Sequence, residues 1–305
     1  MTHLPASTPW ISPSATAQDI APVGLIGYPV EHSLSPAMHN AAFEQLGLPY
    51  HYVLLPTSPG QLGERVLRCV EQGFAGWNVT VPHKTDILTY LDKMSDEVRA
   101  TGACNTVRVE AGSLSGFNTD STGFMAGLEE AGGIAPGSRA VLLGAGGAAR
   151  GVAWALSQAG HEVCILARRP EQASALAEAL SAGTPSPVQQ GTLDAPTLAR
   201  ALDGASLLVN CTQAGMWPHD DTTPIPGGMR LPGGILVYDL VYIPRPTRLL
   251  REASMAGCRT QDGLAMLVHQ GAAAFEIWTG MPAPVDTMRQ ACLDALSDRK
   301  QVTKL

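Results

Sequence analysis

The sequence lacks the features that would point to a nucleic acid, a membrane or an oxidising compartment. Its 305 residues carry a formal net charge of -7, and lysine and arginine form no run, which excludes the basic surfaces that bind nucleic acid or anionic membranes. No stretch reaches the roughly 18 consecutive apolar residues that a membrane-spanning helix needs. We therefore expect a cytoplasmic protein whose ligands are small molecules.

Paired cysteines and targeting segments are also missing. The six cysteines form no Cys-x-x-Cys pair and stand near no pair of histidines, so we expect isolated buried thiols and no metal site. They are Cys69, Cys104, Cys164, Cys211, Cys258 and Cys292. Residues 1–20 have neither the apolar core of a signal peptide nor the arginine content of a transit peptide, and we interpret them as a disordered tail.

The length of the chain predicts two domains. At roughly 150 residues per domain, each half is long enough to enclose its own apolar core. Apolar residues make up 45% of the chain and charged residues 15%, a composition typical of globular proteins. We expect a cleft between the two domains.

Short apolar runs alternate with helical spacings in the first part of the chain. The expected strands are Pro22–Gly27, His51–Leu55 and Gly76–Val81, and the expected helices are Pro36–Leu46 and Leu62–Glu71. This alternation predicts an α/β domain with a mostly parallel sheet over residues 21–120. Polar side chains such as Ser33 and Lys84 follow the strand ends, where open α/β sheets bind ligands.

A glycine-rich turn marks a second domain. The strand Ala140–Leu143 leads into this turn, and a helix is expected at Arg150–Gln158. Further strands are expected at Val163–Ala167, Leu207–Asn210 and Ile235–Leu240. This order predicts a Rossmann-type doubly wound nucleotide-binding domain over residues 121–260. The helical stretch Leu264–Trp278 has no strand after it, so we expect residues 261–300 to complete the first domain and to carry Gln270 to the cleft.

The glycine-rich turn fits a dinucleotide fingerprint. Gly144 permits the tight turn, Gly146 lets the backbone approach the pyrophosphate, and Ala149 allows close helix packing. The residues expected to hold the phosphates are Gly144, Ala145, Gly146, Gly147 and Ala148. Such a turn alone is a weak signal, but the strand before it and the helix after it supply the required context.

Two arginines follow the second strand of this domain. An NAD enzyme places an acid there to bind the ribose hydroxyls, whereas this chain has Arg168 and Arg169. Two guanidinium groups suit a 2′-phosphate, which favours NADP. The alternative for one of them is an ordinary solvated surface charge, and Glu171 could pair with either.

Several separate motifs resemble the shikimate dehydrogenase family when they are taken in order. They are Ser33-Leu34-Ser35, Asn78 to Lys84, Gly102 to Thr106, Gly116 to Asp120, Asn210-Cys211-Thr212 with Gly215-Met216, Asp239 to Tyr242 with Pro244 and Thr247, and Asp262 to Gln270. Alone, Lys84 would be interpreted as a solvated lysine and Asp120 as a helix cap. The resemblance runs through both domains, which makes chance agreement implausible.

The resemblance implies an NADPH-dependent, reversible reduction of 3-dehydroshikimate to shikimate, on the route to chorismate and the aromatic amino acids. It implies that Lys84 transfers a proton at the ring oxygen and that Asp120 orients it. The substrate-binding residues that it implies are Ser33, Ser35, Thr80, Asn105, Asp120, Tyr242 and Gln270. For the cofactor it adds Leu240, Gly263, Met266 and Asp96. A homodimer would be typical of the family.

The chain departs from the family pattern at two places. The family commonly has Asn-Arg-Thr where this chain has Ala167-Arg168-Arg169, and a proline where Gln213 stands. These departures concern the cofactor preference. The alternative enzyme is a quinate or dual quinate/shikimate dehydrogenase that uses NAD. A non-catalytic metabolite and nucleotide sensor is the alternative from another class, although a sensor is expected to lack Lys84 or Asp120.

Overall fold

The computed structural model describes residues 20–181, 188–227 and 229–302. The chain divides into two compact units. Unit 1 contains the chain up to Ser95, Cys104–Thr119 and the chain from Gln270 onward, and unit 2 contains Asp96–Ala103 and Asp120–His269. Except for the exposed Ile20, the predicted tail at residues 1–20 lies outside the described residues.

Unit 1 is built on a six-stranded mixed sheet with the strand order β2-β1-β3-β5-β6-β4. Its strands are β1 (Ala21–Gly27), β2 (Tyr50–Pro56), β3 (Gly76–Val79), β4 (Lys93–Met94), β5 (Thr106–Glu110) and β6 (Ser113–Phe117). β1 is parallel to β2 and β3, and β4 is parallel to β6. β5 is antiparallel to β3 and β6. The predicted strands and the mostly parallel sheet are confirmed, except that β3 ends at Val79, two residues before the expected end.

The β5–β6 hairpin was not among the predicted elements. Its two-residue turn is Ala111-Gly112, with φ of 50° and 80°. Turns of this kind need positive φ at both central residues, and Asn-Gly is the sequence that usually signals them. Because alanine stands at the first position here, the local signal is weak. The pairing with β3 and the buried face of the sheet determine the hairpin instead.

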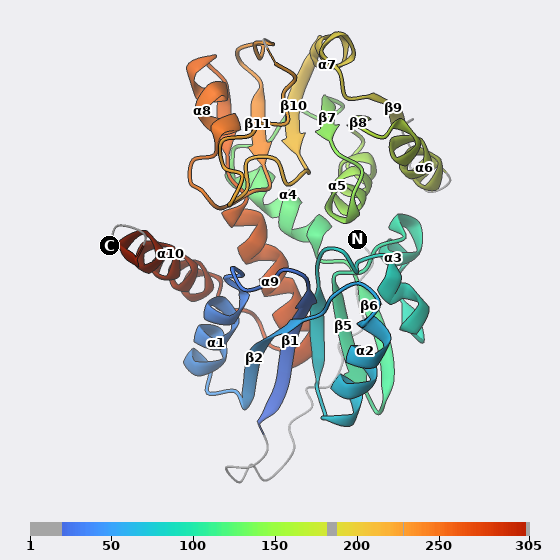
Figure 1. Cartoon of the computed structure of the whole chain (residues 1–305), viewed down its shortest axis with the longest axis vertical. Helices are drawn as coiled ribbons and strands as arrows, with labels where there is room; N and C mark the ends of the chain where they lie inside the picture. Colours follow the sequence, from blue (N-terminus) through green and yellow to red (C-terminus); the bar gives the residue numbers. More distant parts are fainter. Residues whose placement is uncertain (1–19, 182–187, 228, 303–305) are drawn as a thin grey trace. The chain divides into compact units, whose positions relative to one another are not determined.

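The helices of unit 1 bury an aromatic cluster against the sheet. They are α1 (Ser35–Gln45), α2 (Leu62–Glu71), the 3₁₀ helix η1 (Asp86–Tyr90), α10 (Val285–Val302) and the second part of α9 (Leu264–Thr279). α1 packs against α10 and β2 (Figure 1). His39 on α1 stacks on Tyr52 with ring centroids 4.5 Å apart, and Phe43 stacks on Phe275 at 5.1 Å. Burial lowers the pKa of His39 to about 3, so this histidine is neutral.

Unit 2 contains a six-stranded sheet in which every neighbouring pair is parallel. Its strands are β7 (Arg139–Leu143), β8 (Glu162–Ala167), β9 (Val188–Thr192), β10 (Ala205–Asn210), β11 (Leu236–Asp239) and β12 (Arg259–Gln261). The order β12-β11-β10-β7-β8-β9 is doubly wound, and the winding reverses beside β7 (Figure 1). The predicted Rossmann-type fold is confirmed.

Alternate residues of these strands face two separate apolar clusters, since side chains along a strand alternate between its faces. Ala140 and Leu142 of β7 face α4 (Asp120–Glu130), α5 (Gly147–Gln158) and α6 (Pro170–Ser181). Val141 and Leu143 face α7 (Ala195–Leu202) and α8 (Arg248–Met255). Because both faces are covered, the four central strands consist of nearly continuous apolar runs, whereas the edge strands β9 and β12 are polar.

Two helices also differ from the expected elements. α5 begins at Gly147, three residues before the expected start, because the extended backbone ends at Gly146 with φ −80° and ψ −172°. The short helix α3 (Asp96–Thr101) belongs to unit 2, where it packs on α5 and α6. The guanidinium of Arg150 donates to the Thr101 carbonyl at 2.8 Å. No helix of the described chain is long and apolar enough to cross a membrane.

Candidate active site

In unit 1, the topology brings several of the predicted site residues to one edge of the sheet. Loops follow β1 and β3 at their carboxyl ends, which meet at the same edge because the two strands are parallel. β5 begins at this edge and β6 ends at it, since Asn78 of β3 pairs with Thr106 of β5, which pairs with Phe117 of β6. Residues 28–35, 80–85, 104–105 and 118–119 therefore gather there.

Two serines form a hydroxyl pair in the loop after β1. The Ser33 and Ser35 hydroxyls are 3.1 Å apart, and the Ser35 amide donates to the Ser33 hydroxyl at 3.1 Å. Ser35 is the first residue of α1, and Pro36 follows it at a position where a helix tolerates proline. The side chain of Ser35 is buried. This pair is an acceptor and donor set for a hydroxyl or carboxylate ligand.

The segment after β3 holds Thr80 and Lys84. The Thr80 amide donates to the Ile26 carbonyl at 2.8 Å, which fixes Thr80 at the ends of β1 and β3. The Lys84 carbonyl accepts from the Cys104 amide at 2.8 Å, and the Lys84 side chain is half-buried. The segment is further held by His83, whose Nε2 lies 2.7 Å from the Thr57 carbonyl oxygen. The backbone of Lys84 is therefore tied to the segment that leads into Asn105.

Asn105 is the centre of a buried polar network. Its Oδ1 accepts from the Thr119 amide at 2.7 Å and from the Thr106 hydroxyl at 3.0 Å. Its Nδ2 donates to the Thr119 hydroxyl at 2.9 Å and to Gln270 Oε1 at 3.4 Å. Asn78 donates to the Asn105 carbonyl at 3.2 Å. The amide of Asn105 thus has one orientation, and the structure brings Asn105 and Gln270 into direct contact.

In unit 2, Asp120 is the first residue of α4 and is buried. Next to it, the Ser121 hydroxyl is hydrogen-bonded to the Glu97 carboxyl and lies 3.1 Å from the Gly151 carbonyl oxygen. Burial raises the pKa of Glu97 to about 7, the Ser121 hydrogen bond opposes this, and the Asp120 charge adds to it. Asp120 therefore lies beside the Glu97 carboxyl group, which keeps its own proton up to about pH 7.

The glycine-rich turn leaves room for a ligand at the amino terminus of α5. Gly144 has φ of 103°, a backbone conformation that L side chains rarely adopt. At Gly146 an added Cβ would meet no atom within 4 Å. Among the described residues no side chain caps the helix at Gly146, so the amide groups of its first turn are available to an anion. Ala145 is buried, whereas Gly147 and Ala148 are half-buried.

Arg168 and Arg169 follow β8 at the same edge of the sheet, and both are exposed. Glu171 follows them in the sequence, but in the described part of the chain neither guanidinium pairs with a carboxylate. Asp96, the first residue of α3, is also exposed and lies 3.8 Å from Arg99. The two arginines are therefore available to an exposed phosphate.

The remaining predicted cofactor residues lie at the end of β11 and at the start of α9. An added Cβ at Gly263 would lie 2.0 Å from the Leu240 carbonyl oxygen. The close approach that requires glycine is therefore to the backbone of Leu240. Met266 is buried in the apolar cluster that includes Phe124. Tyr242 is half-buried in the loop after β11.

Comparisons with known proteins agree with this architecture. Residues 25–107 match the family model of the shikimate dehydrogenase substrate binding domain. Residues 263–293 match the model of the shikimate 5'-dehydrogenase C-terminal domain. Residues 139–201 match the profile described as NADP oxidoreductase coenzyme F420-dependent.

Relatives align over nearly the whole chain. The shikimate dehydrogenase (NADP(+)) of Moorella thermoacetica is 48% identical over 90% of this chain and 93% of its own length. The protein of the same name from Methanopyrus kandleri is 45% identical over 90% and 95%. The crystal structure of shikimate 5-dehydrogenase from Thermus thermophilus in complex with NADP(H) and shikimate superposes with a TM-score of 0.81 at 40% identity, covering 90% of this chain and 100% of that chain.

The chain belongs to the shikimate dehydrogenase family. The family resemblance seen in the sequence motifs is thereby confirmed. For this family fold, a nucleotide is expected at the carboxyl edge of the unit 2 sheet, where the glycine-rich turn, Arg168 and Leu240 stand.

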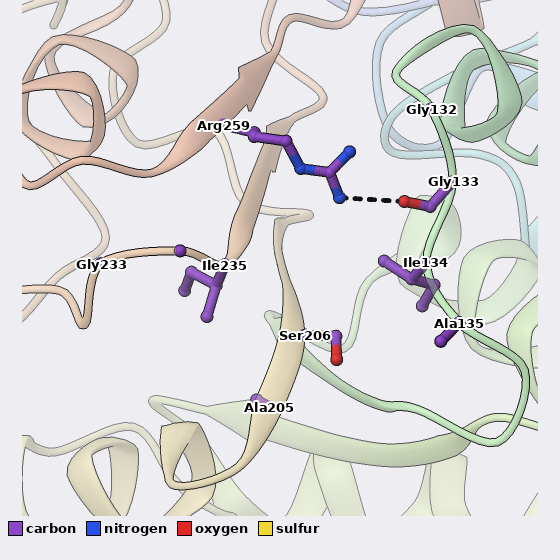
Figure 2. A pocket seen from close by; sticks show the side chains of 10 residues that line it. Gly132, Gly133, Ile134, Ala135, Ala205, Ser206, Gly233, Ile235 and Arg259 are labelled. Carbon is purple, nitrogen blue, oxygen red and sulfur yellow. Dashed lines mark hydrogen bonds between the residues drawn. The ribbon is translucent and has the colours of Figure 1, made fainter.

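A cavity of about 560 Å³ lies at the opposite edge of that sheet. It is lined at the amino ends of β10, β11 and β12 by Ala205, Ile235 and Arg259 (Figure 2). The Arg259 guanidinium donates to the Ala131 and Gly133 carbonyls, each at 3.0 Å. Open α/β sheets bind ligands at the carboxyl ends of their strands. This cavity is therefore not the nucleotide site of a shikimate dehydrogenase family member.

Sequence reasoning did not single out the residues that hold the site residues in place. Thr119 fixes the side-chain amide of Asn105, Asn78 holds the main-chain carbonyl of Asn105, and Glu97 lies beside Asp120. One signal was available for Asn78, which stands between two apolar residues in a strand whose every residue is buried. A polar side chain in such a strand needs a partner. Glu97 carries no comparable signal, because only the packing of α3 buries it.

Proposed function

We propose that this chain is an NADP-dependent shikimate dehydrogenase, which reversibly reduces 3-dehydroshikimate to shikimate on the route to chorismate and the aromatic amino acids. One observation supports this most strongly. The same chain holds a hydroxyl and amide set suited to a polyol acid and a glycine-rich turn followed by two exposed arginines. Its relatives of 45% and 48% identity carry the name shikimate dehydrogenase (NADP(+)).

We assign substrate recognition to hydrogen-bonding side chains. The proposed set is Ser33, Ser35, Thr80, Asn105, Asp120, Tyr242 and Gln270. A carboxylate needs donors, and ring hydroxyls need groups that both donate and accept, which hydroxyl and amide side chains supply. Because Thr119 and Thr106 fix the Oδ1 of Asn105, its Nδ2 points in one direction as a donor. That fixed orientation favours one arrangement of ring hydroxyls.

The residues at the carboxyl edge of unit 2 fit NADP. The open space at Gly146 suits a pyrophosphate against the first-turn amides of α5. The 2′-phosphate is assigned to Arg168 and Arg169, which provide charge without a competing carboxylate in the described chain. Leu240, Gly263 and Met266 are assigned to the nicotinamide end, and Asp96 is assigned on the resemblance alone. When bound, NADP accepts or supplies the hydride.

We assign proton transfer to Lys84 and its orientation to Asp120. In the direction of reduction the ring ketone oxygen gains negative charge, and the Lys84 ammonium stabilises that charge and then donates a proton to it. In the reverse direction the neutral amine accepts the hydroxyl proton. Asp120 is assigned the role of orienting the Lys84 ammonium on the family resemblance.

The test is an absorbance assay at the NADPH band with the purified protein. We expect shikimate oxidation with NADP⁺, and 3-dehydroshikimate reduction with NADPH, without added metal and without loss on chelation. Quinate and NAD⁺ are assayed in parallel. Absence of turnover in both directions, with NADP binding intact, would refute the enzyme proposal. Equal use of NAD⁺ and NADP⁺, or a preference for quinate, would favour the quinate-type alternative.

We further propose a cytoplasmic location and a homodimer. The six cysteines are all free thiols, as expected in a reducing compartment. The homodimer is supported only by the family resemblance, and sedimentation of the purified protein tests it. The functional division proposed is a catalytic domain over residues 21–120, completed by 261–300, and an NADP-binding domain over residues 121–260.

A further inference from the structure

Asp239 is a fully buried carboxylate at the end of β11. It accepts three hydrogen bonds from three different segments of unit 2. The donors are Asn210 Nδ2 at 2.8 Å, the Thr247 hydroxyl at 2.6 Å and the Val241 amide at 3.1 Å. Asn210 ends β10, Val241 lies in the loop after β11, and Thr247 caps α8. One carboxylate therefore joins three segments at the carboxyl edge of the sheet.

Asn210 extends this network into the loop after β10. Its Oδ1 accepts from the Thr212 amide at 2.9 Å and from the Thr212 hydroxyl at 2.7 Å. Its Nδ2 also donates to the Ala214 carbonyl at 3.2 Å. All four polar contacts of the Asn210 side chain are thus used, and its orientation depends on Asp239 accepting a hydrogen bond. The conformation of residues 211–214 is set through Asn210.

No lysine, arginine or histidine in the described chain pairs with Asp239. Burial raises the pKa of its carboxyl to about 6, its three hydrogen bonds oppose this rise, and the negative charge of Asp262 adds to it. Asp262 is itself paired with Arg245 at 2.5 Å. The other titratable neighbour is the Cys211 thiol, whose pKa is raised by burial and by the charges of Asp239 and Asp120. On α8, Arg248 forms an ion pair with Glu252.

We propose that Asp239 is a positioning residue, whose ionised carboxylate holds the loops that carry Leu240, Tyr242 and residues 211–214 in the arrangement that binds NADP. This inference rests on the proposed function, in which Leu240 and Tyr242 are assigned to the nicotinamide and the substrate. Asp239 itself touches neither ligand in this assignment. Its action is through the backbone of the loop after β11 and through Asn210.

Protonation of Asp239 changes the hydrogen-bond balance. A proton on Oδ2 turns an acceptor into a donor, so the Thr247 hydroxyl must accept from Asp239 and direct its own hydrogen elsewhere. The same Thr247 oxygen already accepts from the Leu250 amide at 3.3 Å as the cap of α8. Thr247 then no longer donates to a carboxylate, and the loss of this charge-assisted hydrogen bond weakens the link between β11 and α8. We expect the affinity for NADP to fall as the pH drops below about 6, by at most about tenfold per pH unit, until it reaches the affinity of the protonated form.

The test measures NADP binding by calorimetry between pH 5 and pH 8, together with the KM and kcat for NADP⁺. Asp239→Asn is a near-isosteric substitute for the protonated residue. We expect it to bind NADP at least about tenfold more weakly than the wild type at pH 8. Its affinity should fall less steeply than that of the wild type below pH 6, because only the 2′-phosphate of NADP, with a second pKa of about 6, still titrates there. KM should rise with little change in kcat. Asp203→Asn, a change at the opposite edge of the sheet, serves as the control and should keep the wild-type profile.

A second pair of variants covers the case in which Asp239→Asn does not fold. Thr247→Ser keeps the hydroxyl and should retain wild-type binding, whereas Thr247→Val removes the donor and should weaken it. Wild-type affinity and an unchanged pH profile in Asp239→Asn, or in Thr247→Val, would overturn the proposal. The calorimetric readout needs only NADP binding. If the wild type binds NADP but does not oxidise shikimate, the proposed function fails while the inference on Asp239 is still tested.

Discussion

At the scale of single residues, the charged groups assigned to proton transfer are more buried than those assigned to the 2′-phosphate of NADP. Lys84 is half-buried and Asp120 is buried, whereas Arg168 and Arg169 are exposed. A proton-transferring ammonium acts most strongly where water is partly excluded. Recognition of a phosphate at the edge of a sheet needs only charge and donors that solvent can reach, and salt screens it.

Lys84→Ala should lower kcat by about a hundredfold or more and leave the KM for shikimate within a few fold, because proton-transfer catalysis contributes about 10² to 10⁴. Steady-state kinetics in both directions measures this. Lys93→Ala removes an exposed lysine of β4 and should behave as the wild type. A Lys84 variant with weakened affinity and normal kcat would move Lys84 from the chemistry to binding.

Arg168→Ala and Arg169→Ala should each weaken kcat/KM with NADP⁺ while leaving the values with NAD⁺ nearly unchanged. A charged hydrogen bond to a 2′-phosphate contributes about 1.5–3 kcal/mol, which corresponds to roughly ten to a hundredfold. Kinetics with both cofactors at low and high salt measures the difference, which added salt should reduce. Arg200→Ala on α7 is the control. Equal losses with the two cofactors would instead assign these arginines to adenine stacking or to the fold.

At the scale of elements, the loops at the carboxyl edge of the unit 2 sheet are held by backbone contacts and by a few buried polar groups. The Gly144 amide donates to the Leu166 carbonyl at 2.8 Å, and the Leu240 amide donates to the Asn210 carbonyl at 3.1 Å. Each of these strand ends is thus tied to its neighbour. The glycines at this edge then divide into those that the fold requires and those that a ligand requires.

Gly146→Ala and Gly263→Ala should fail in different ways. At Gly146 the backbone suits alanine and the space is open, so the stability should be kept while the affinity for NADP falls by about tenfold or more. At Gly263 the new Cβ would meet the Leu240 carbonyl oxygen, so the free energy of unfolding should fall by about 1–3 kcal/mol. Urea unfolding and NADP calorimetry on both variants measure this. Normal NADP affinity in Gly146→Ala would contradict the pyrophosphate assignment.

At the scale of the whole molecule, two buried carboxyl groups make the stability depend on pH. The pKa of Glu97 is raised to about 7 and that of Asp239 to about 6, in both cases mainly by burial. An unfolded Glu or Asp loses its proton near pH 4. Between that pH and the raised values the folded chain holds protons that the unfolded chain has lost. From these two groups, the free energy of unfolding therefore falls as the pH rises through this range.

Glu97→Gln should remove the Glu97 part of this dependence. Glutamine keeps an acceptor oxygen for the Ser121 hydroxyl but does not ionise, so the variant should gain stability over the wild type at pH 8 and gain little at pH 5. Urea unfolding at the two pH values measures the gain. Glu129→Gln, an exposed change on α4, should show no such difference. The same change in stability at both pH values would show that Glu97 does not titrate in this range.

Much of this molecule follows from local pattern. The strands of both sheets that consist of short apolar runs, the glycine-rich turn and the helix Leu264–Thr279 were predictable, since buried parallel strands and tight phosphate-binding turns restrict residue type at each position. The family was predictable for the same reason, because its motifs lie at these restricted positions. The residues of the catalytic and binding assignments stay predictions that rest on those motifs.

Other features were decided only when distant segments packed together. The hairpin of β5 and β6 depends on pairing with β3, and α3 belongs to unit 2 because it packs on α5 and α6. The burial of Glu97 and of Asp239, and hence their raised pKa values, comes from neighbours far away in the chain. A sequence motif specifies which group is present, but the desolvation of that group and its hydrogen-bond partners depend on tertiary contacts between segments that no local pattern encodes.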